Sequence, residues 1–292
     1  MDIIEFIEKD DFFVIFDNGL VKESNFISNN NFVISKNGNY KIIYSNVVAN
    51  QNVSFKVDKG VKANITEIYS KYSNNSKYNL YIELLDNAVV DFLTIRFVEN
   101  EINYTSKVVL SVNSIFRQIN VCKINEQTSG KVVVELNGNF SKADIKNIIL
   151  NESSKKQIHE FKIMHNISET ESYLLNYAVC DNKSILFIDN EGFVFEGAEK
   201  SNMNQITKGI ILDLESEISA NPILKIDNYN VIANHGASIG AIDDEELFYL
   251  MSRGLTKADS EKLILSGYFT FVVNEIRDEK IKDYILNNLL RE

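Results

Sequence analysis

The sequence predicts a mainly β chain that ends in a small helical segment. Between Phe12 and Ile239, short runs of β-branched, aromatic and other apolar residues alternate with clusters of Asn, Gly, Asp and Ser, as expected of strands joined by tight turns. Helical periodicity is nearly absent from this part, and a chain with one proline must use Asn and Gly for its turns. After residue 242 the pattern changes to capped helices.

Five of these runs are the clearest strand candidates. They are Phe32–Ser35, Tyr40–Tyr44, Val53–Val57, Tyr81–Leu85 and Val132–Leu136. No short repeat of fixed period links them, so the residues alone permit either a β-sandwich or an irregular solenoid. With 292 residues, the chain is long enough to bury a substantial core.

The first helix is marked at both ends. Asp243 and Glu246 have the spacing of a capping box, with a carboxylate at the cap in place of the usual hydroxyl. Gly254 can take the left-handed conformation that ends a helix. We therefore expect this helix to begin after Asp243 and to end just before Gly254.

Two more helices are expected to complete the helical segment. Thr256 is a suitable cap for the second helix, which we expect to end at Gly267. An imperfect apolar stripe predicts the third helix from Tyr268 to Leu289. Three helices would then lie between residues 243 and 290.

The strand-to-helix junction carries the most specific pattern in the chain. Residues 235–255 read H-G-A-S-I-G-A-I-D-D-E-E-L-F-Y-L-M-S-R-G-L, and G-Y-F follows at 267–269. This resembles the C-terminal signature of the SufB/SufD family, the scaffold proteins of the SUF iron–sulfur assembly system. A weaker resemblance extends upstream through P-I-L-K-I at 222–226 to the spacing of His165, Thr170 and Ser172.

The resemblance implies a fold that composition does not decide. It implies a right-handed parallel β-helix over residues 1–242, with a short lead-in at 1–11, and a helical subdomain at 243–292. At roughly 20–25 residues per coil, about 200 residues would form some nine coils, or a stack ~45 Å long. The helical subdomain can cover the end of this stack, and in the family it is the docking region for SufC, the ABC-type ATPase.

His235 is the main candidate for the assembly site. A strand period of two places it on one side with Val231, Ala233 and Ala237, which on its own favours a hydrogen-bonded histidine in an apolar layer. The resemblance implies instead that this histidine lies at the interface with a SufB-like partner, where a transient iron–sulfur cluster is built. Neutral imidazole is a suitable ligand for iron, so His235 is also a possible metal ligand.

The resemblance is closer to SufD-like than to SufB-like proteins. SufB-like proteins hold an essential cysteine 28 positions before the histidine, where this chain has Thr207, and they flank the histidine with glutamates, where it has Asn234 and Gly236. SufD-like proteins often carry a cysteine at the position of Ala233. Because thiolates are the usual anchors of iron–sulfur clusters, the site needs a partner to complete it.

The helical subdomain supplies the candidate ATPase-binding residues. Aromatic and arginine side chains dominate protein–protein hot spots, so we expect Phe248, Tyr249 and Arg253 to be anchors. Asp243 and Glu246 belong to an acidic cluster that can meet a basic surface on the ATPase. The structural alternatives are that Arg253 caps its own helix and that Phe248 is part of the core.

The other cysteines and histidines do not form a recognisable site. Cys122 and Cys180 are 58 positions apart, outside any C-x-x-C or ferredoxin spacing, so two unrelated core residues are favoured, with an exposed thiol at Cys180 left open. His159 and His165 have only Glu160 nearby as a carboxylate, which disfavours a metal site. We expect His165 to support the coil structurally.

The composition of the chain and the absence of known enzyme motifs disfavour several classes of function. The net charge of −11 disfavours nucleic acid as a partner, and no stretch is long and apolar enough to span a membrane. The phosphate-loop, dinucleotide-binding, zinc-protease and hydrolase-elbow motifs are absent from the sequence, so we expect no enzymatic activity.

The expected role is that of a scaffold subunit of the SUF complex in the cytoplasm. Its partners would be a SufC-like ATPase and either a SufB-like paralogue or a second copy of this chain. Two other roles remain as alternatives: a purely structural SufC adaptor that does not ligate iron, and a polysaccharide-acting β-helix enzyme. The adaptor differs from the scaffold in predicting no effect of His235 on cluster formation.

Overall fold

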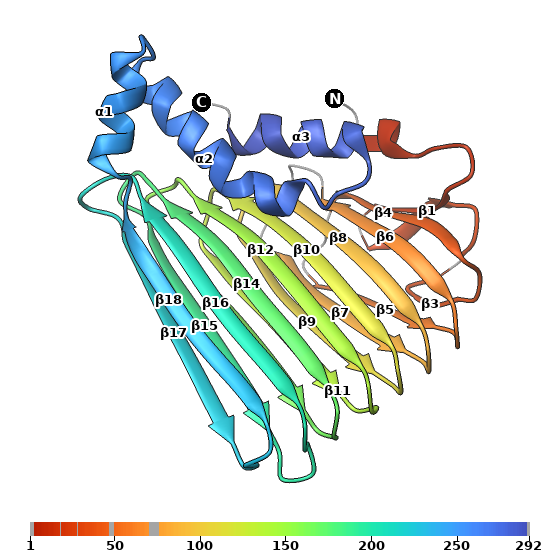
Figure 1. Ribbon diagram of the computed structural model, residues 1–292. Helices are drawn as coiled ribbons and strands as arrows, with labels where there is room; N and C mark the ends of the chain where they lie inside the picture. Colours follow the sequence, from red (N-terminus) through yellow and green to blue (C-terminus); the bar gives the residue numbers. More distant parts are fainter. Residues whose placement is uncertain (1–2, 18, 28, 47–49, 70–75, 291–292) are drawn as a thin grey trace.

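The chain forms a parallel β-helix with two long sheets and three helices along one side (Figure 1). The computed structural model describes residues 3–17, 19–27, 29–46, 50–69 and 76–290. The first two residues of the expected lead-in and the last two of the expected helical subdomain lie outside these ranges.

The two sheets alternate along the chain, so each coil contributes one strand to each sheet. The ten-stranded sheet holds β1 (Phe12–Asp17), β2 (Leu20–Ser24), β4 (Gly38–Asn46), β6 (Lys62–Tyr69), β8 (Val89–Val98), β10 (Ile115–Ile124), β12 (Lys142–Asn151), β14 (Glu171–Cys180), β16 (Asn202–Ile211) and β18 (Ile232–Ala241). The eight-stranded sheet holds β3 (Asn31–Ile34), β5 (Asn50–Val57), β7 (Ser76–Leu84), β9 (Ile102–Leu110), β11 (Thr128–Leu136), β13 (Lys156–His165), β15 (Ile185–Val194) and β17 (Glu217–Ile226). The five strands expected from the sequence fall on β3, β4, β5, β7 and β11.

The coils are longer and fewer than we expected. Val89 lies beside Ile115, 26 positions on, whereas Glu171 lies beside Asn202, 31 positions on. The solenoid therefore has about eight turns, instead of the nine expected from 20–25 residues per coil. Because the coil length changes along the chain, no fixed repeat is visible in the sequence.

Asparagines shape many of the turns between strands, as the scarcity of proline predicts. Asn87 and Asn113 occupy matching turns of successive coils, and both have the left-handed backbone conformation, with φ of 61° and 56°. Asn113 Nδ2 donates a hydrogen bond of 2.7 Å to Asn87 Oδ1. The short asparagine side chain tolerates this conformation, so neighbouring turns can stack at the coil spacing.

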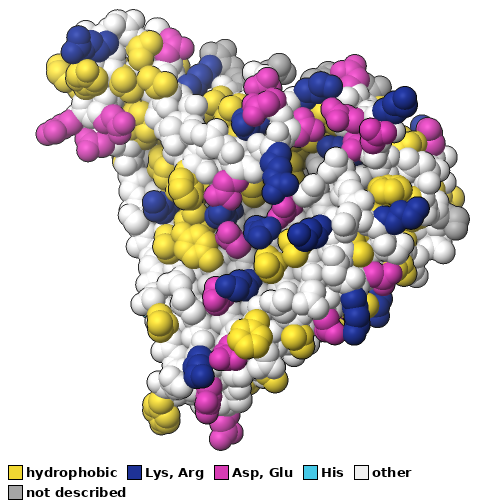
Figure 2. Space-filling view, turned by 45° about the vertical axis from the view of Figure 1, so that its right-hand side comes forward, with side chains coloured by type: hydrophobic (Ala, Val, Ile, Leu, Met, Phe, Trp, Pro, Cys, Tyr) yellow, Lys and Arg dark blue, Asp and Glu magenta, His cyan; other side chains and the backbone are white. Residues whose placement is uncertain are grey.

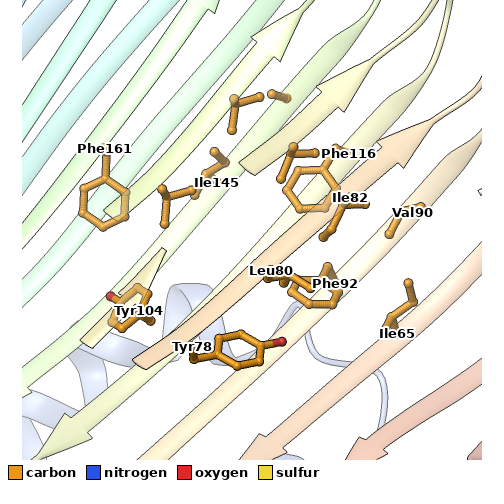
Figure 3. Close-up of a cluster of buried hydrophobic side chains, with 14 of the residues drawn as sticks. Ile65, Tyr78, Leu80, Ile82, Val90, Phe92, Tyr104, Phe116, Ile145 and Phe161 are labelled. Carbon is orange, nitrogen blue, oxygen red and sulfur yellow. The ribbon is translucent and has the colours of Figure 1, made fainter. Parts of the chain in front are cut away.

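The interior between the two sheets is filled by apolar and aromatic side chains. Figure 3 shows the middle of this core, where Tyr78, Phe92, Tyr104, Phe116 and Phe161 point inward from both sheets. All five are almost fully buried. This packing stabilises the stack because each coil buries its apolar face against its neighbours.

Two of the three helices, α2 (Lys257–Val273) and α3 (Glu279–Leu289), pack along the outer face of the ten-stranded sheet. The first helix, α1 (Asp244–Ser252), has no buried residue. Phe269 and Ile285 belong to a hydrophobic cluster that includes Ile95 and Ile148 on the sheet. In Figure 1, α2 and α3 run across the strands. The expectation that the helices cover the end of the solenoid is therefore wrong.

The helix boundaries correct two of our expectations. Asp243 caps α1 by accepting from the backbone N–H of Glu245 at 2.8 Å, and Gly254 follows with φ of 97°, both as expected in position. However, α2 does not end at Gly267 but continues to Val273, and the third helix begins only at Glu279. Apolar contacts of the last turns with the sheet outweigh the helix-weakening effect of one glycine.

Candidate functional site

His235 lies on β18 and faces the inside of the β-helix at its open end. Its Cα partner on β16 is Gln205, which is fully buried. Ala233 and Ala237 lie on either side of His235 on the same face, which confirms the pattern expected from a strand period of two. Because β18 is the last strand of its sheet, the His235 side chain is exposed.

The open end consists of two edge strands, each of which is paired on one side only. Each of β17 and β18 is ten residues long and ends its sheet (Figure 1). Among the described residues these edges have no strand partner, so their backbone N–H and C=O groups are free to pair with another chain. Exposed apolar side chains accompany them: Ile223, Ile226, Ile232 and Ile239.

A row of buried polar residues runs inside the solenoid towards this end. Its members, which we call the polar ladder, occupy matching inward positions on consecutive strands of the ten-stranded sheet: Glu67, Thr94, Asn120, Asn147, Asn176 and Thr207. All six are at most 1% exposed. The next position in the row is Ala237, two residues after His235.

The ladder begins at a buried ion pair. Arg96 Nη2 lies 3.5 Å from Glu67 Oε2, and Tyr78 Oη donates to Glu67 Oε1 at 2.5 Å. Burial raises the pKa of Glu67, and Arg96 and the tyrosine hydroxyls partly offset this rise. The Arg96 guanidinium stacks 4.2 Å from the centre of the Tyr104 ring, so its charge is held well inside the solenoid.

The two cysteines are buried core residues, as favoured from their spacing. Cys122 is 1% exposed and Cys180 is fully buried, so the exposed thiol left open for Cys180 is excluded. Burial raises the pKa of Cys122 and raises that of Cys180 to about 11. Neither thiol is therefore positioned or ionised for cluster ligation.

His159 and His165 are also structural. His159 Nδ1 bonds to Tyr104 Oη at 2.9 Å. The two ring nitrogens of His165 bond to the hydroxyls of Thr170 at 2.6 Å and Ser172 at 2.8 Å, which agrees with a supporting role. Burial lowers the pKa of His165 to about 4 and that of His159 to about 3, so both are neutral near pH 7.

The helix α1 projects from the body and presents the expected partner-binding residues to solvent. It has no buried residue; Phe248 is 75% exposed and Tyr249 is 55% exposed. The Arg253 guanidinium lies 5.1 Å from the centre of the Tyr249 ring. Figure 2 shows hydrophobic side chains on this projecting end with acidic side chains beside them. The core alternative for Phe248 is therefore wrong.

The acidic candidates lie at the base of α1. Asp243 is its N-cap, and Glu246 lines a cavity of about 460 Å³ between α1, α2 and the end of β18. The Asp243 carboxylate bonds to the second helical residue rather than the third, so it is a simple cap and not the capping box we expected. Leu250, Leu263 and Tyr268 make the rest of this cavity largely apolar.

A second groove, of about 780 Å³, lies where the loop between α2 and α3 meets the ten-stranded sheet. Charged residues line it, but they pair with one another across the groove. Lys146 Nζ lies 2.6 Å from Glu275 Oε2, and Arg277 Nη2 lies 3.3 Å from Asp91 Oδ2. These pairs fasten the loop to the sheet.

Metal-binding clusters and membrane-spanning helices are both absent from the described part of the chain. No group of three or more His, Cys, Asp or Glu side chains is arranged to hold a metal ion there. None of the described helices is long and apolar enough to cross a membrane.

The family of the chain follows from a comparison of its sequence with known protein families. Residues 40–268, which span nearly all the coils and reach into α2, match the SufBD core domain of SUF system FeS cluster assembly. The chain belongs to the SufB/SufD family. The family match covers both the open end with His235 and the exposed helix α1.

Several similar curated relatives are SufD proteins, which supports the SufD-like assignment within the SufB/SufD family. The iron-sulfur cluster assembly protein SufD of Bacillus subtilis is 30% identical over 165 residues, which is 56% of this chain and 38% of that protein. SufD of Escherichia coli is 23% identical over 217 residues, 74% of this chain and 50% of that protein. SufD of Plasmodium falciparum is 24% identical over 276 residues, 91% of this chain and 17% of that protein. The chain thus spans half the length of these relatives or less.

Reasoning from the sequence missed the polar ladder. Asn120, Asn147 and Asn176 are 27 and 29 positions apart, so no constant period marks them. A search for polar residues within otherwise apolar strands, at spacings of 25–32, would have found them.

Proposed function

We propose that this chain is a SufD-like scaffold subunit that takes part in iron–sulfur cluster assembly in the cytoplasm. Its open end would pair with a cysteine-bearing SufB-like partner, or with a second copy, and α1 would bind a SufC-type ATPase. The observation that carries the proposal is the open end itself, which consists of two ten-residue edge strands, one of them carrying the exposed His235. Family membership and the SufD relatives support this role.

Pairing through β17 and β18 is expected because long unpaired edges are templates for strand addition. Sedimentation at micromolar concentration should show a dimer of the chain alone or a heterodimer with the partner. Ile232→Lys, on the open edge, should weaken this association. Val33→Lys is the matched control, since Val33 has similar exposure (54% against 60%) on the short strand β3. A strict monomer under both conditions would contradict the proposal.

Binding of the ATPase is expected to depend on the exposed face of α1. Phe248→Ala should reduce SufC binding at least tenfold while the melting temperature stays unchanged, because the side chain is 75% exposed. Phe271→Ala is the control, since this residue is 60% exposed on α2 instead. Deleting all three helices is unsuitable, because α2 and α3 cover apolar side chains of the sheet. Undiminished binding by Phe248→Ala would place the ATPase elsewhere.

Cluster formation is expected to need both a partner thiolate and His235. Alone, the chain should hold little cluster, because Thr207 and Ala233 supply no thiolate at the open end and both cysteines are buried elsewhere. With the partner and SufC, His235→Ala should lower the cluster yield without unfolding the chain, since it leaves no buried cavity. Asn234→Ala is the control at the neighbouring exposed position. A normal yield with His235→Ala would favour the adaptor alternative.

A further inference from the structure

From Arg96 to the open end, the side-chain hydrogen bonds of the polar ladder run in one direction. Arginine can only donate, and Arg96 Nη1 lies 2.7 Å from a side-chain atom of Asn120, which must therefore be the acceptor Oδ1. The amide nitrogen of Asn120 then faces Asn147, whose Oδ1 is 3.3 Å away. The charge of Arg96 thus decides which way the first amide is turned.

The orientation of the Asn120 amide in turn fixes the orientation of the asparagine amides on the next coils. Asn147 Nδ2 donates to Asn176 Oδ1 at 2.7 Å, so Asn176 must direct its own nitrogen towards the open end. That nitrogen donates to Thr207 Oγ1 at 3.1 Å and to Asn190 Oδ1 at 3.0 Å. Asn190 Nδ2 in turn donates to Thr207 Oγ1 at 2.9 Å. The Thr207 oxygen therefore accepts two N–H hydrogen bonds.

The Thr207 hydroxyl can therefore form only one more hydrogen bond, as a donor. A hydroxyl has two acceptor lone pairs and one hydrogen, and both lone pairs are already engaged. Among the described residues, none accepts a hydrogen bond from the Thr207 hydroxyl, although this side chain is only 1% exposed. A chain of bonds that begins at a cation also polarises its members, which makes the terminal O–H a stronger donor.

Thr207 lies beside the last strand, β18, at the open end of the β-helix. Its Cα partner in the last coil is Ala237, whose side chain ends at Cβ, and His235 lies two residues away on the same inner face. One hydroxyl donor, one imidazole, the buried amide of Gln205 and apolar alanines suit a weakly hydrated monoanion. They do not suit phosphate or sulfate, which need many donors to replace their hydration.

We propose that Thr207 donates a hydrogen bond to a small sulfur anion bound inside the last coil beside His235. The anion would be the hydrosulfide ion or a thiolate of the partner, which are the same chemistry from two sources. The inference rests on the proposed scaffold function, because that function brings sulfur to this end.

The test is a titration of the protein, labelled with ¹³C at alanine and threonine methyls, with sodium hydrosulfide under anaerobic conditions. Sodium sulfate at matched ionic strength serves as the control, because sulfate does not suit the site. The methyl signals of Ala237 and Thr207 should shift saturably with hydrosulfide in the unsubstituted protein. Thr207→Val, which keeps the shape but lacks the hydroxyl, should bind at least tenfold more weakly, and Thr207→Ser should restore binding. For the second source, the same signals are followed with the SufB-like partner before and after its thiols are alkylated.

A variant far from the site tests the role of the ladder. Asn147→Leu leaves Thr207, Asn176 and Asn190 in place but frees Asn176 to turn its oxygen towards the Thr207 hydroxyl. We expect weaker hydrosulfide binding by this variant at temperatures where circular dichroism shows it folded. Equal affinity would overturn the directional role of the ladder.

The outcomes separate this inference from the scaffold function. No saturable shift in the unsubstituted protein, with hydrosulfide or with the partner, would overturn the anion site, and this result does not depend on any variant folding. Binding retained by Thr207→Val would overturn the role of the hydroxyl. Because binding is measured without iron or SufC, either failure leaves the cluster-yield test of His235 intact.

Discussion

The buried histidine His165 should make stability fall in mildly acidic solution. Both its ring nitrogens are engaged by hydroxyls, and burial lowers its pKa from 6.5 to about 4. The unfolded chain therefore binds a proton below pH 6.5 that the folded chain does not bind until about pH 4. Stability is complete above pH 6.5 and is lost as the pH falls through this window. Each pH unit is worth about 1.4 kcal/mol per histidine at most, so the fall from pH 6.5 to 4.5 costs roughly 2 kcal/mol for His165.

The measurement is urea unfolding of the protein and of His165→Gln between pH 7.5 and 4.5. His159, with a pKa of about 3, adds a similar slope in both proteins, so the variant should show about half the dependence on pH of the parent. The carboxylates that titrate near pH 4.5 are shared by both proteins, and their contribution cancels in the comparison. Equal slopes for the two proteins would refute the assignment of a neutral, proton-excluding His165.

The remaining predictions concern packing and the loop between α2 and α3. Gly130→Ala should destabilise the protein by ~1–3 kcal/mol in urea unfolding, because the added Cβ would lie 2.2 Å from the ring of Tyr104. The same change at Gly267, an open helical position, should stabilise it by ~0.5–1 kcal/mol, and a loss there would contradict the helix we describe. Glu275→Gln should cost ~1 kcal/mol at low salt by weakening the pair with Lys146, and the cost should shrink in 1 M NaCl.

The sequence was most informative where local chemistry decides the structure. Asp243, Gly254 and Thr256 mark helix ends because caps and left-handed stops depend on a few neighbouring residues, and all three lie where we expected. Gly267 misled us because the end of α2 is decided by contacts with a sheet distant in the sequence. Local propensity is a weak guide when tertiary packing is available.

The candidate site was predictable only in part. His235 could be found because it lies within a continuous pattern of residues, and its inward direction follows from the strand period. Thr207 could be assigned to the same site only by resemblance. The ladder behind Thr207 joins residues on consecutive coils of unequal length. The pairing of Asn120 with Asn147, and of Asn147 with Asn176, is set by the register of the strands, which the sequence does not display.

The edge strands at the two ends of the solenoid differ in length, and this difference limits the assemblies that the protein can form. At the amino-terminal end, β2 turns back antiparallel onto β1 and closes the ten-stranded sheet with five residues, while the eight-stranded sheet ends in a strand of four. Among the residues that the structure describes, β17 and β18 are therefore the only pair of long edge strands through which one chain could join another. The proposed association would therefore stop at two molecules instead of continuing as a fibre, and the stack of parallel strands would be protected from polymerisation through its edges.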